Sequence, residues 1–291
     1  MQYYKLLILS VALLIASLFF YLNSTEKVKN LDIAKIIDFN KIEFAWEKTP
    51  MDNSHYFNRE KFVKELSISR FNVYQFILYH KREPLYFPFI EKKLKEAWIP
   101  DDFKYLAVAE SWLKNDALSD SNAWGIWQFI PETWKRFWLT INEQIDERYN
   151  FEKETDAAIA YFKKLYEDFH DWTLVAAAYN RWENGIRRAL DDQKVNSYYD
   201  LYLNEETSRY VYRILAIKYL MENRYKIFDK TELWDQFDAP KTKEIEVWKI
   251  ANLKTWSTDK RYIYANIKQL NGWIIWESLP EWKWKLKILD Y

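Results

Sequence analysis

The spacing of apolar residues predicts a mainly helical protein. From about residue 58 to residue 228, apolar side chains return every three or four positions, the repeat of a helix with one buried face. Few stretches of this region alternate as strands do. The predicted helices are Arg59 to Ser67, Asn72 to His80, Pro88 to Ala97, Asp101 to Leu113, Pro131 to Phe137, Thr155 to Phe169, Thr173 to Trp182 and Thr207 to Arg224.

The pattern changes after about residue 240. Short runs rich in Ile, Val and Lys, at Glu244 to Ile250 and Lys285 to Ile288, are separated by turn signals. These runs predict a small α+β tail over residues 240–291. The predicted fold class is therefore mainly α, with a small α+β C-terminal segment.

The N-terminus carries an apolar run at residues 6–22, interrupted only by Ser10 and Ser17. Lys5 precedes it and polar residues follow from Asn23, the pattern of a membrane-inserting segment. No small-residue cleavage site precedes the bulky residues 19–22, so we predict an uncleaved N-terminal membrane anchor helix over 1–29, with a cleaved signal segment as the alternative. Either form places residues 30–291 on the cell-wall side of the cytoplasmic membrane, in the cell envelope.

Composition excludes several kinds of chemistry. Forty-three Lys and Arg balance forty-three Asp and Glu, so the basic footprint of a nucleic-acid binder is missing. With no Cys and three scattered His, disulfide frameworks, zinc clusters and Cys-His nucleophiles are also excluded. We therefore expect chemistry by carboxylates, hydroxyls and amides, without a metal or an organic cofactor.

One feature of the composition is abnormal. The chain has 3 Gly and 16 Trp, where average usage predicts about 20 Gly. Several Trp follow helices or stand in turn-like sequence, at Trp98, Trp138, Trp256, Trp276 and Trp282, where the backbone favours glycine. We hypothesise that many of these Trp are glycines encoded by a reassigned UGA codon; the alternative is a Trp-rich surface that stacks on sugars.

Glu110 is the first candidate for catalysis. In the predicted helix Asp101 to Leu113, Phe103, Leu106, Ala107 and Glu110 fall at i, i+3, i+4 and i+7, so Glu110 continues the apolar stripe. Desolvation of a carboxyl there raises its pKa, which suits a general acid near neutral pH. Taken alone, Glu110 could also be a paired structural carboxylate or a helix-end residue.

The segments around Glu110 resemble the catalytic domain of the lytic transglycosylases. The resemblance lies in the order and spacing of Ala109-Glu110-Ser111, Ser119, Gly125 to Thr133, Ala178-Tyr179-Asn180, Glu206-Thr207 and Tyr210-Val211. Upstream, Phe44 to Glu47 and Ala97 to Ala107 are similar to the lead-in of the membrane-bound type D. The resemblance implies a lysozyme-like fold of the goose type, with a helical lead-in at 30–95 and a catalytic domain at 96–228.

The tail has a weaker resemblance. Leu270-Asn271-Gly272, Leu279-Pro280 and Lys285 to Ile288 are similar to the segment that follows the catalytic domain in type D proteins, and faintly to LysM glycan-binding modules. Residues 240–291 are thus either a second glycan site or a cover for the catalytic helices.

The resemblance implies a reaction with one carboxylate. Glu110 is the single general acid/base that cleaves the β-1,4 bond between N-acetylmuramic acid and N-acetylglucosamine and closes a 1,6-anhydro ring. The partner is the glycan strand of peptidoglycan; protein partners are not indicated. The residues expected to line the groove are Ser119, Gln128, Tyr179, Asn180 and Glu206.

Each of these groove residues also has a structural interpretation. Tyr179 could belong to the core, and Asn180 could be an amide at a helix end. Gln128 could form hydrogen bonds with buried backbone groups, and Glu206 could cap the helix that begins near Thr207. For the whole chain, the alternatives are a lysozyme-like hydrolase that uses Glu110 and water, and a non-catalytic protein that binds peptidoglycan or acts as a scaffold.

Some Trp depart from the family pattern. Trp46, Trp98, Trp134, Trp138 and Trp182 stand where the family usually has Gly or another small residue. A bulky Trp182 beside Tyr179-Asn180, or Trp124 before Gly125, could obstruct the groove.

Overall fold

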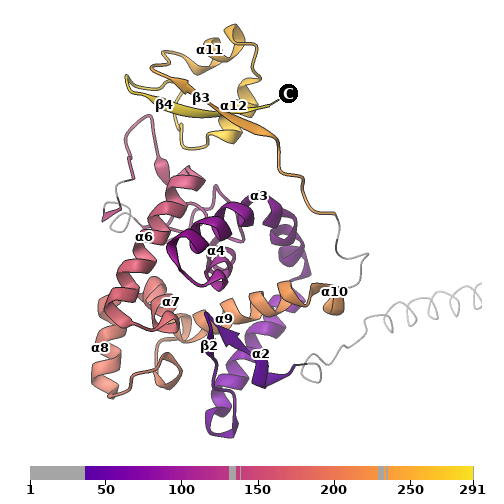
Figure 1. The fold of residues 1–291 in the computed structure, drawn as a ribbon, viewed down its shortest axis with the longest axis vertical. Helices are drawn as coiled ribbons and strands as arrows, with labels where there is room; N and C mark the ends of the chain where they lie inside the picture. The colour runs from indigo at the N-terminus through magenta and orange to yellow at the C-terminus, as the bar shows by residue number, and fades with distance from the viewer. Residues whose placement is uncertain (1–36, 131–135, 138, 229–232, 234, 291) are drawn as a thin grey trace, which may run out of the picture. The chain divides into compact units, whose positions relative to one another are not determined.

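The chain is mainly helical, as the apolar spacing predicts. The computed structural model describes residues 37–130, 136–137, 139–228, 233 and 235–290 (Figure 1). Short 3-10 turns at residues 39–41, 53–55, 101–103, 147–149 and 198–200 and a small hairpin, β1 (Glu43–Phe44) with β2 (Glu47–Lys48), join the helices. The helices before the tail are α2 (Tyr56–Phe71), α3 (Val73–Ala97), α4 (Lys104–Ser111), α6 (Phe151–Phe169), α7 (Trp172–Arg181), α8 (Glu183–Gln193), α9 (Glu205–Glu222) and α10 (Arg224–Ile227).

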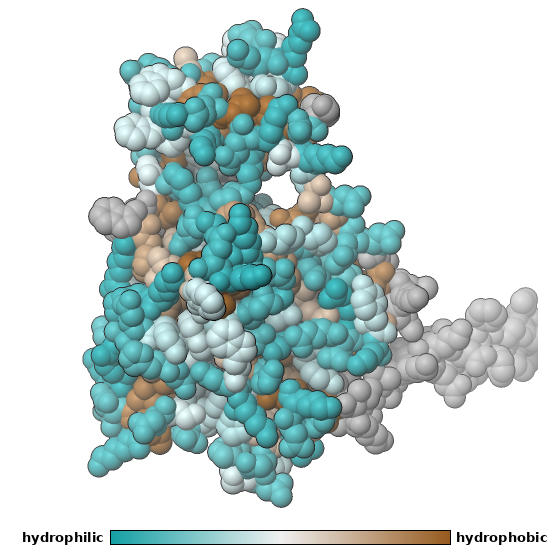
Figure 2. Space-filling view, viewed as in Figure 1, coloured by the Kyte–Doolittle hydropathy of each residue, from teal (hydrophilic) through white to brown (hydrophobic). Residues whose placement is uncertain are grey.

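The predicted membrane anchor at residues 1–29 lies outside the described residues. Among the helices that are described, none is both long enough and apolar enough to cross a bilayer. The face seen in Figure 2 is mostly hydrophilic, with apolar residues in small separate patches. The helices therefore turn their polar sides outward there, as amphipathic helices around a core do.

Helix α4 lies inside the helical core. Its residues Tyr105 to Ala109 are all buried, and the helix packs against α3 and α9; Figure 1 shows it between them. Helix α2 packs on α9, and α6 packs on α3 and α7. The last turn of α4 is thus held by helices that are far apart in the sequence.

Two predicted helices are one in the structure. Asn72 to His80 and Pro88 to Ala97 were expected to be separate, because proline removes a backbone donor and crowds the preceding turn. Instead α3 runs through Pro84 and Pro88, and Phe76, Phe87 and Leu94 along it are buried. Tertiary packing of this apolar face offsets the cost of the two prolines.

The bounds of the other helices also differ from the predicted ranges, most clearly at α4, which is Lys104–Ser111 with a 3-10 turn before it, and at α6. Helix α6 begins at Phe151, because the Asn150 side chain accepts a hydrogen bond from the Lys153 N–H at 3.1 Å and caps it. Helix α8 was not predicted, since only Ile186 of its residues is buried and no apolar stripe marks it. Most of the predicted helix Pro131 to Phe137 lies outside the described residues.

The predicted α+β tail is confirmed. Strands β3 (Thr242–Val247) and β4 (Trp284–Leu289) pair antiparallel, from Thr242 opposite Leu289 to Val247 opposite Trp284. Helices α11 (Leu253–Asp259) and α12 (Tyr264–Leu270) lie between them in the sequence. The tail core comprises Ile250, Leu253, Ile267, Trp273, Ile274, Leu279, Leu286 and Ile288, together with Ile145 from the helical region.

The backbone at several tryptophans is of the kind that favours glycine. Trp46, Trp98 and Trp182 have φ of 68°, 60° and 73°. Trp98 ends α3 in the left-handed region, the predicted position of a glycine cap. Trp112, which the sequence did not single out, ends α4 in the same way, with φ of 56°. The interpretation of these positions as glycine-like is supported at the helix ends.

Other tryptophans do not follow this interpretation. Trp256 lies inside α11, and neither Trp276 nor Trp282 has positive φ. Trp276 and Trp282 lie in bends with ordinary backbone angles. Trp134 and Trp138 lie outside the described residues.

Replacement of Trp98 by glycine should stabilise the protein. A residue with a Cβ pays about 1–2 kcal/mol in the left-handed region, and the Trp98 side chain, 87% exposed, contributes little burial. We expect Trp98→Gly to raise the free energy of unfolding by about 1 kcal/mol in urea titrations. The matched control is Trp248→Gly, at an exposed tryptophan without positive φ; an equal gain in the control would contradict the prediction.

The reassigned codon can be tested directly. We expect the codons for Trp46, Trp98 and Trp182 to be UGA, and tryptic peptides of the protein from its own cells to carry glycine masses at these positions. UGG codons with tryptophan masses would refute the hypothesis and leave three large side chains in strained backbone.

Candidate active site

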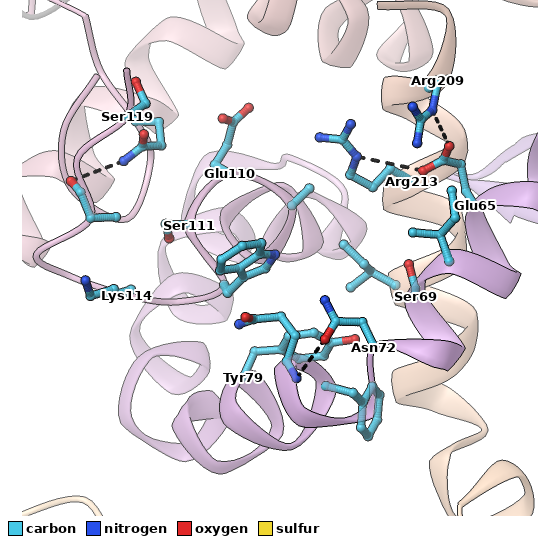
Figure 3. A pocket seen from close by; sticks show the side chains of 18 of the residues that line it. Glu65, Ser69, Asn72, Tyr79, Glu110, Ser111, Lys114, Ser119, Arg209 and Arg213 are labelled. Atoms are coloured by element: carbon cyan, nitrogen blue, oxygen red, sulfur yellow. Dashed lines mark hydrogen bonds and ion pairs between the residues drawn. The ribbon is translucent and has the colours of Figure 1, made fainter. Parts of the chain in front are cut away.

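Glu110 lies in the last turn of α4, at the position its apolar stripe predicts. Phe103, Leu106 and Ala107 of the stripe are fully buried, whereas Glu110 is partly exposed. Its carboxyl group reaches the surface between two cavities, of about 540 Å³ and about 470 Å³, and lines both. Figure 3 shows its side chain at the edge of the first cavity, with Ser119 on one side and Arg213 of α9 on the other.

The surroundings of Glu110 raise its pKa. Desolvation is the largest influence and raises the pKa of the carboxyl from 4.5 to about 7, while the Tyr210 hydroxyl and the Arg213 guanidinium oppose it and Glu206 adds to it. The Tyr210 hydroxyl donates a short hydrogen bond to Glu110 Oε1. A carboxyl of this kind exists in both protonation states near neutral pH, so it can give and take a proton.

All six predicted site residues line the second cavity: Glu110, Ser119, Gln128, Tyr179, Asn180 and Glu206. They come from α4, the loop after it, α7 and the first turn of α9. Segments separated by up to about a hundred residues in sequence thus meet around one carboxyl group. Glu110, Ser119 and Gln128 also line the first cavity, so the two cavities adjoin as one groove with Glu110 between them.

Three of these side chains also hold the groove wall together. The Tyr179 hydroxyl donates to the Trp127 carbonyl at 2.7 Å. Gln128 Nε2 donates to the Gly125 carbonyl at 2.8 Å and to the Ala117 carbonyl at 3.3 Å. Ser119 Oγ accepts from the Ala123 N–H at 3.0 Å. The structural interpretations of Tyr179 and Gln128 therefore hold alongside their position in the groove.

Glu206 is not the cap of its helix. Asn204 caps α9, because its side chain accepts from the Thr207 N–H at 3.2 Å. The Glu206 carboxyl in the first turn is thus available to the groove. Its partial exposure and its place among the lining residues agree with this.

A second buried carboxyl group supports the wall from behind. Glu154 of α6 is fully buried, and its carboxylate accepts hydrogen bonds from the N–H groups of Ile126 and Trp127, at 3.0 and 2.7 Å. A Cβ on Gly125, which has φ of 82°, would lie 2.3 Å from Glu154 Oε1. Only glycine fits there, and the 125–128 turn is fixed by its contact with Glu154.

Sequence reasoning missed the roles of Tyr210, Arg213 and Glu154. Tyr210 is part of the Tyr210-Val211 motif, but nothing in the spacing of the motifs indicated that its hydroxyl forms a hydrogen bond with Glu110. Glu154 could have been found from its stripe, since Ala158, Tyr161 and Leu165 follow it at helical spacing and all are buried. Among the described residues, no group of His, Cys, Asp and Glu is arranged to hold a metal ion.

Comparison with known proteins gives a family for this region. Residues 87–201 match the Transglycosylase SLT domain. The chain is 32% identical over 148 residues to membrane-bound lytic murein transglycosylase D of Escherichia coli K12, which is 49% of this chain and 32% of that protein. It is 29% identical over 115 residues to a putative tributyltin chloride resistance protein of Alteromonas sp. M-1, covering 39% and 55% of the two. The resemblance predicted from the motifs is confirmed.

Two solved structures are similar at 20% identity. The match to the inactive mutant of the lytic transglycosylase Slt from Pseudomonas aeruginosa covers 51% of this chain and 26% of the Slt chain, with a TM-score of 0.39. The match to the 70 kDa soluble lytic transglycosylase of Escherichia coli covers 60% of this chain and 32% of that chain, with a TM-score of 0.43. The chain spans about a third of the first relative's length, so the match concerns the helical region and not a whole relative.

The raised pKa of Glu110 makes stability depend on pH. Since the pKa is about 7 in the folded protein against 4.5 for the free group, the unfolded chain ionises first and the folded state loses stability as pH rises from 4.5 to 7. Glu110→Gln removes this loss. At pH 8 we expect the free energy of unfolding of the variant to exceed that of wild type by about 3 kcal/mol. This difference should become smaller toward pH 4.5 in urea titrations.

The control for this prediction is Glu96→Gln, at an exposed glutamate of α3 that pairs with Lys92 at 3.8 Å. It should show no such pH dependence. If the difference in free energy of unfolding between Glu110→Gln and wild type were the same across this pH range, the carboxyl group would not be desolvated.

Proposed function

Because residues 87–201 match the Transglycosylase SLT domain and include Glu110, we propose that this chain is a peptidoglycan lytic transglycosylase. The observation that carries the proposal is the desolvated Glu110 carboxyl group, with a pKa raised to about 7, in the middle of a groove. Its substrate is the β-1,4 bond between N-acetylmuramic acid and N-acetylglucosamine.

In the first step, protonated Glu110 donates its proton to the glycosidic oxygen while the bond from that oxygen to the muramoyl C1 breaks. N-acetylglucosamine leaves with this proton as a new hydroxyl, and the acetamido group of the muramoyl unit stabilises the positive charge at C1. Glu110 is now a carboxylate. The Tyr210 hydroxyl and the Arg213 guanidinium, which both favour the charged form, stabilise it at this stage.

In the second step, the Glu110 carboxylate takes the proton of the muramoyl C6 hydroxyl while that oxygen bonds to C1. The product is a 1,6-anhydromuramoyl end, and Glu110 returns to its protonated form. No water is consumed. Ordinary glycosidases need a second carboxylate at about 5–9 Å; here the substrate's own groups replace it, so one carboxyl group is sufficient.

We assign substrate binding to the residues that line the groove around Glu110. Ser119, Gln128, Asn180 and Glu206 present hydroxyl, amide and carboxyl groups that suit sugar hydroxyls and acetamido groups. Tyr179, whose hydroxyl is engaged by the Trp127 carbonyl, would contribute its ring edge and hold the wall. The lysozyme-like fold and the domain limits 30–95, 96–228 and 240–291 remain predictions.

The location of the protein follows from the same proposal. Peptidoglycan lies outside the cytoplasmic membrane, so an N-terminal anchor at 1–29 would hold residues 30–291 on the cell-wall side. The tail over 240–291 would then serve as a second, LysM-like glycan site or as a cover for the catalytic helices.

Analysis of the products distinguishes the proposed reaction from its rivals. We expect peptidoglycan digested by the protein to yield muropeptides with 1,6-anhydro ends in mass spectrometry. Glu110→Gln should lower the rate at least a hundredfold, since general acid catalysis contributes about 10²–10⁴. Glu96→Gln is the matched control on α3 and should cleave at the wild-type rate.

Each rival predicts a different result. Reducing ends without anhydro sugar would identify a lysozyme-like hydrolase that uses Glu110 and water. Binding to peptidoglycan without cleavage, by wild type and variant alike, would identify a scaffold or glycan-binding protein.

A further inference from the structure

The first cavity, on the α3 side of Glu110, is bordered by cations on two sides, with Lys114 on one side and the arginines of α9 on the other. The cations Lys114, Arg209 and Arg213 line it, with the carboxyl groups of Glu65 and Glu110 (Figure 3). Glu65 is buried and accepts from Arg209 Nε at 2.5 Å, and it lies 3.9 Å from Arg213 Nε. Its negative charge is thus enclosed beneath the arginines. The groups that a ligand would meet are mainly cations.

Helix α3 presents hydrogen-bond donors without acceptors to this cavity. Gln75 Nε2 and the Tyr79 hydroxyl, one turn apart on α3, are buried and have no hydrogen-bond partner among the described residues. Burial raises the pKa of Tyr79, so its hydroxyl stays a donor. Buried donors are rarely left unpaired, since each costs about 1–3 kcal/mol. An acceptor that enters the cavity would satisfy both.

Cations and unpaired donors around one cavity suit an anionic acceptor, and a carboxylate is the simplest. The glycan backbone of peptidoglycan cannot supply it, because its sugars are neutral and the lactyl carboxyl of muramic acid is bound in an amide to the stem peptide. The stem peptide carries free carboxylates. It is therefore the part of the substrate that this cavity can recognise.

We propose that the cavity between α3 and α9 binds a carboxylate of the stem peptide attached to the glycan strand. Lys114 and Arg213 supply the charge, and Gln75 and Tyr79 supply the neutral donors. Arg209 and Glu65 are positioning residues, because their ion pair fixes the guanidinium of Arg213 beside the cavity. This assignment rests on the proposed function and specifies which form of the substrate the enzyme prefers.

Arg213 has a second effect that any test must separate. It favours the charged form of Glu110, so its removal changes the chemistry on every substrate. The measured quantity is therefore a ratio: kcat/KM for glycan strands with native stem peptides, divided by kcat/KM for the same strands with the carboxylates of the stem peptides converted to amides. An effect on Glu110 itself cancels in this ratio.

We expect wild type to prefer strands with native stem peptides over the amidated strands by about tenfold or more, the usual contribution of a hydrogen bond to a charged group. Tyr79→Phe and Lys114→Gln should each lower the ratio at least threefold. Tyr79→Phe removes a hydroxyl without a partner, so it should fold as stably as wild type.

Matched controls are present in the chain. Tyr212→Phe also removes a buried, unpartnered hydroxyl, but Tyr212 does not line the cavity. Lys92 lies 3.8 Å from the Glu96 carboxylate, as Lys114 lies 3.8 Å from that of Asp116, and both lysines are exposed. Lys92→Gln is therefore the control for Lys114→Gln. Both controls should keep the wild-type ratio.

A wild-type ratio near one, which means equal cleavage of amidated and native strands, would overturn the carboxylate site while the lytic activity stands. The same holds if Tyr79→Phe and Lys114→Gln keep the wild-type ratio. Absence of cleavage of every substrate by wild type would instead refute the proposed function on which the site rests.

Discussion

The cost of ionising a carboxyl group at the end of a buried helix governs this site. Every residue of α4 from Tyr105 to Ala109 is buried. Glu110 follows them, at the point where the helix reaches the groove. Complete enclosure would keep the carboxyl permanently neutral, and full exposure would keep it permanently charged. Tyr210 and Arg213 oppose the desolvation, and the balance leaves the pKa near neutrality, where a single group can serve both as acid and as base.

Glu154 shows what the same desolvation does without an opening to the groove. Its pKa is also raised by burial, yet its oxygens are occupied by two backbone N–H groups of the 125–128 turn. It cannot exchange a proton with a substrate. The two glutamates thus differ in what surrounds their oxygens: the carboxyl group of Glu110 is open to the groove, and that of Glu154 fixes the groove wall.

The tail is attached to the segment that backs this wall. Ile145 is part of the tail core, and the Asp146 N–H donates to the Trp273 carbonyl at 2.8 Å. Asp146 also pairs with Arg148 at 2.6 Å, and the Arg148 carbonyl lies against Gly125, 2.4 Å from where a Cβ would be. Contacts therefore run continuously from the tail to the turn that carries Gln128. This connection favours a supporting role for the tail, whether or not it also binds glycan.

Local sequence patterns predicted the features that depend on a single helix. They did not predict contacts between segments that are distant in the sequence. The stripe of α4 sufficed to find Glu110, and the position after α3 sufficed to find the left-handed cap at Trp98. By contrast, the passage of α3 through Pro84 and Pro88 depends on packing of its other face, and the hydrogen bond from Tyr210 depends on how α9 crosses α4. Such contacts have no signature in the spacing of either segment.

The left-handed tryptophans add a constraint on the groove itself. Trp112 ends the helix that bears Glu110, and Trp182 ends the helix that bears Asn180. Each also lines one of the two cavities. A glycine at either position would remove both the backbone strain and a large side chain from the border of the groove. The helix ends at the border of the groove are thus where the identity of the residue matters most, because the same two positions determine both local backbone strain and the width of the groove.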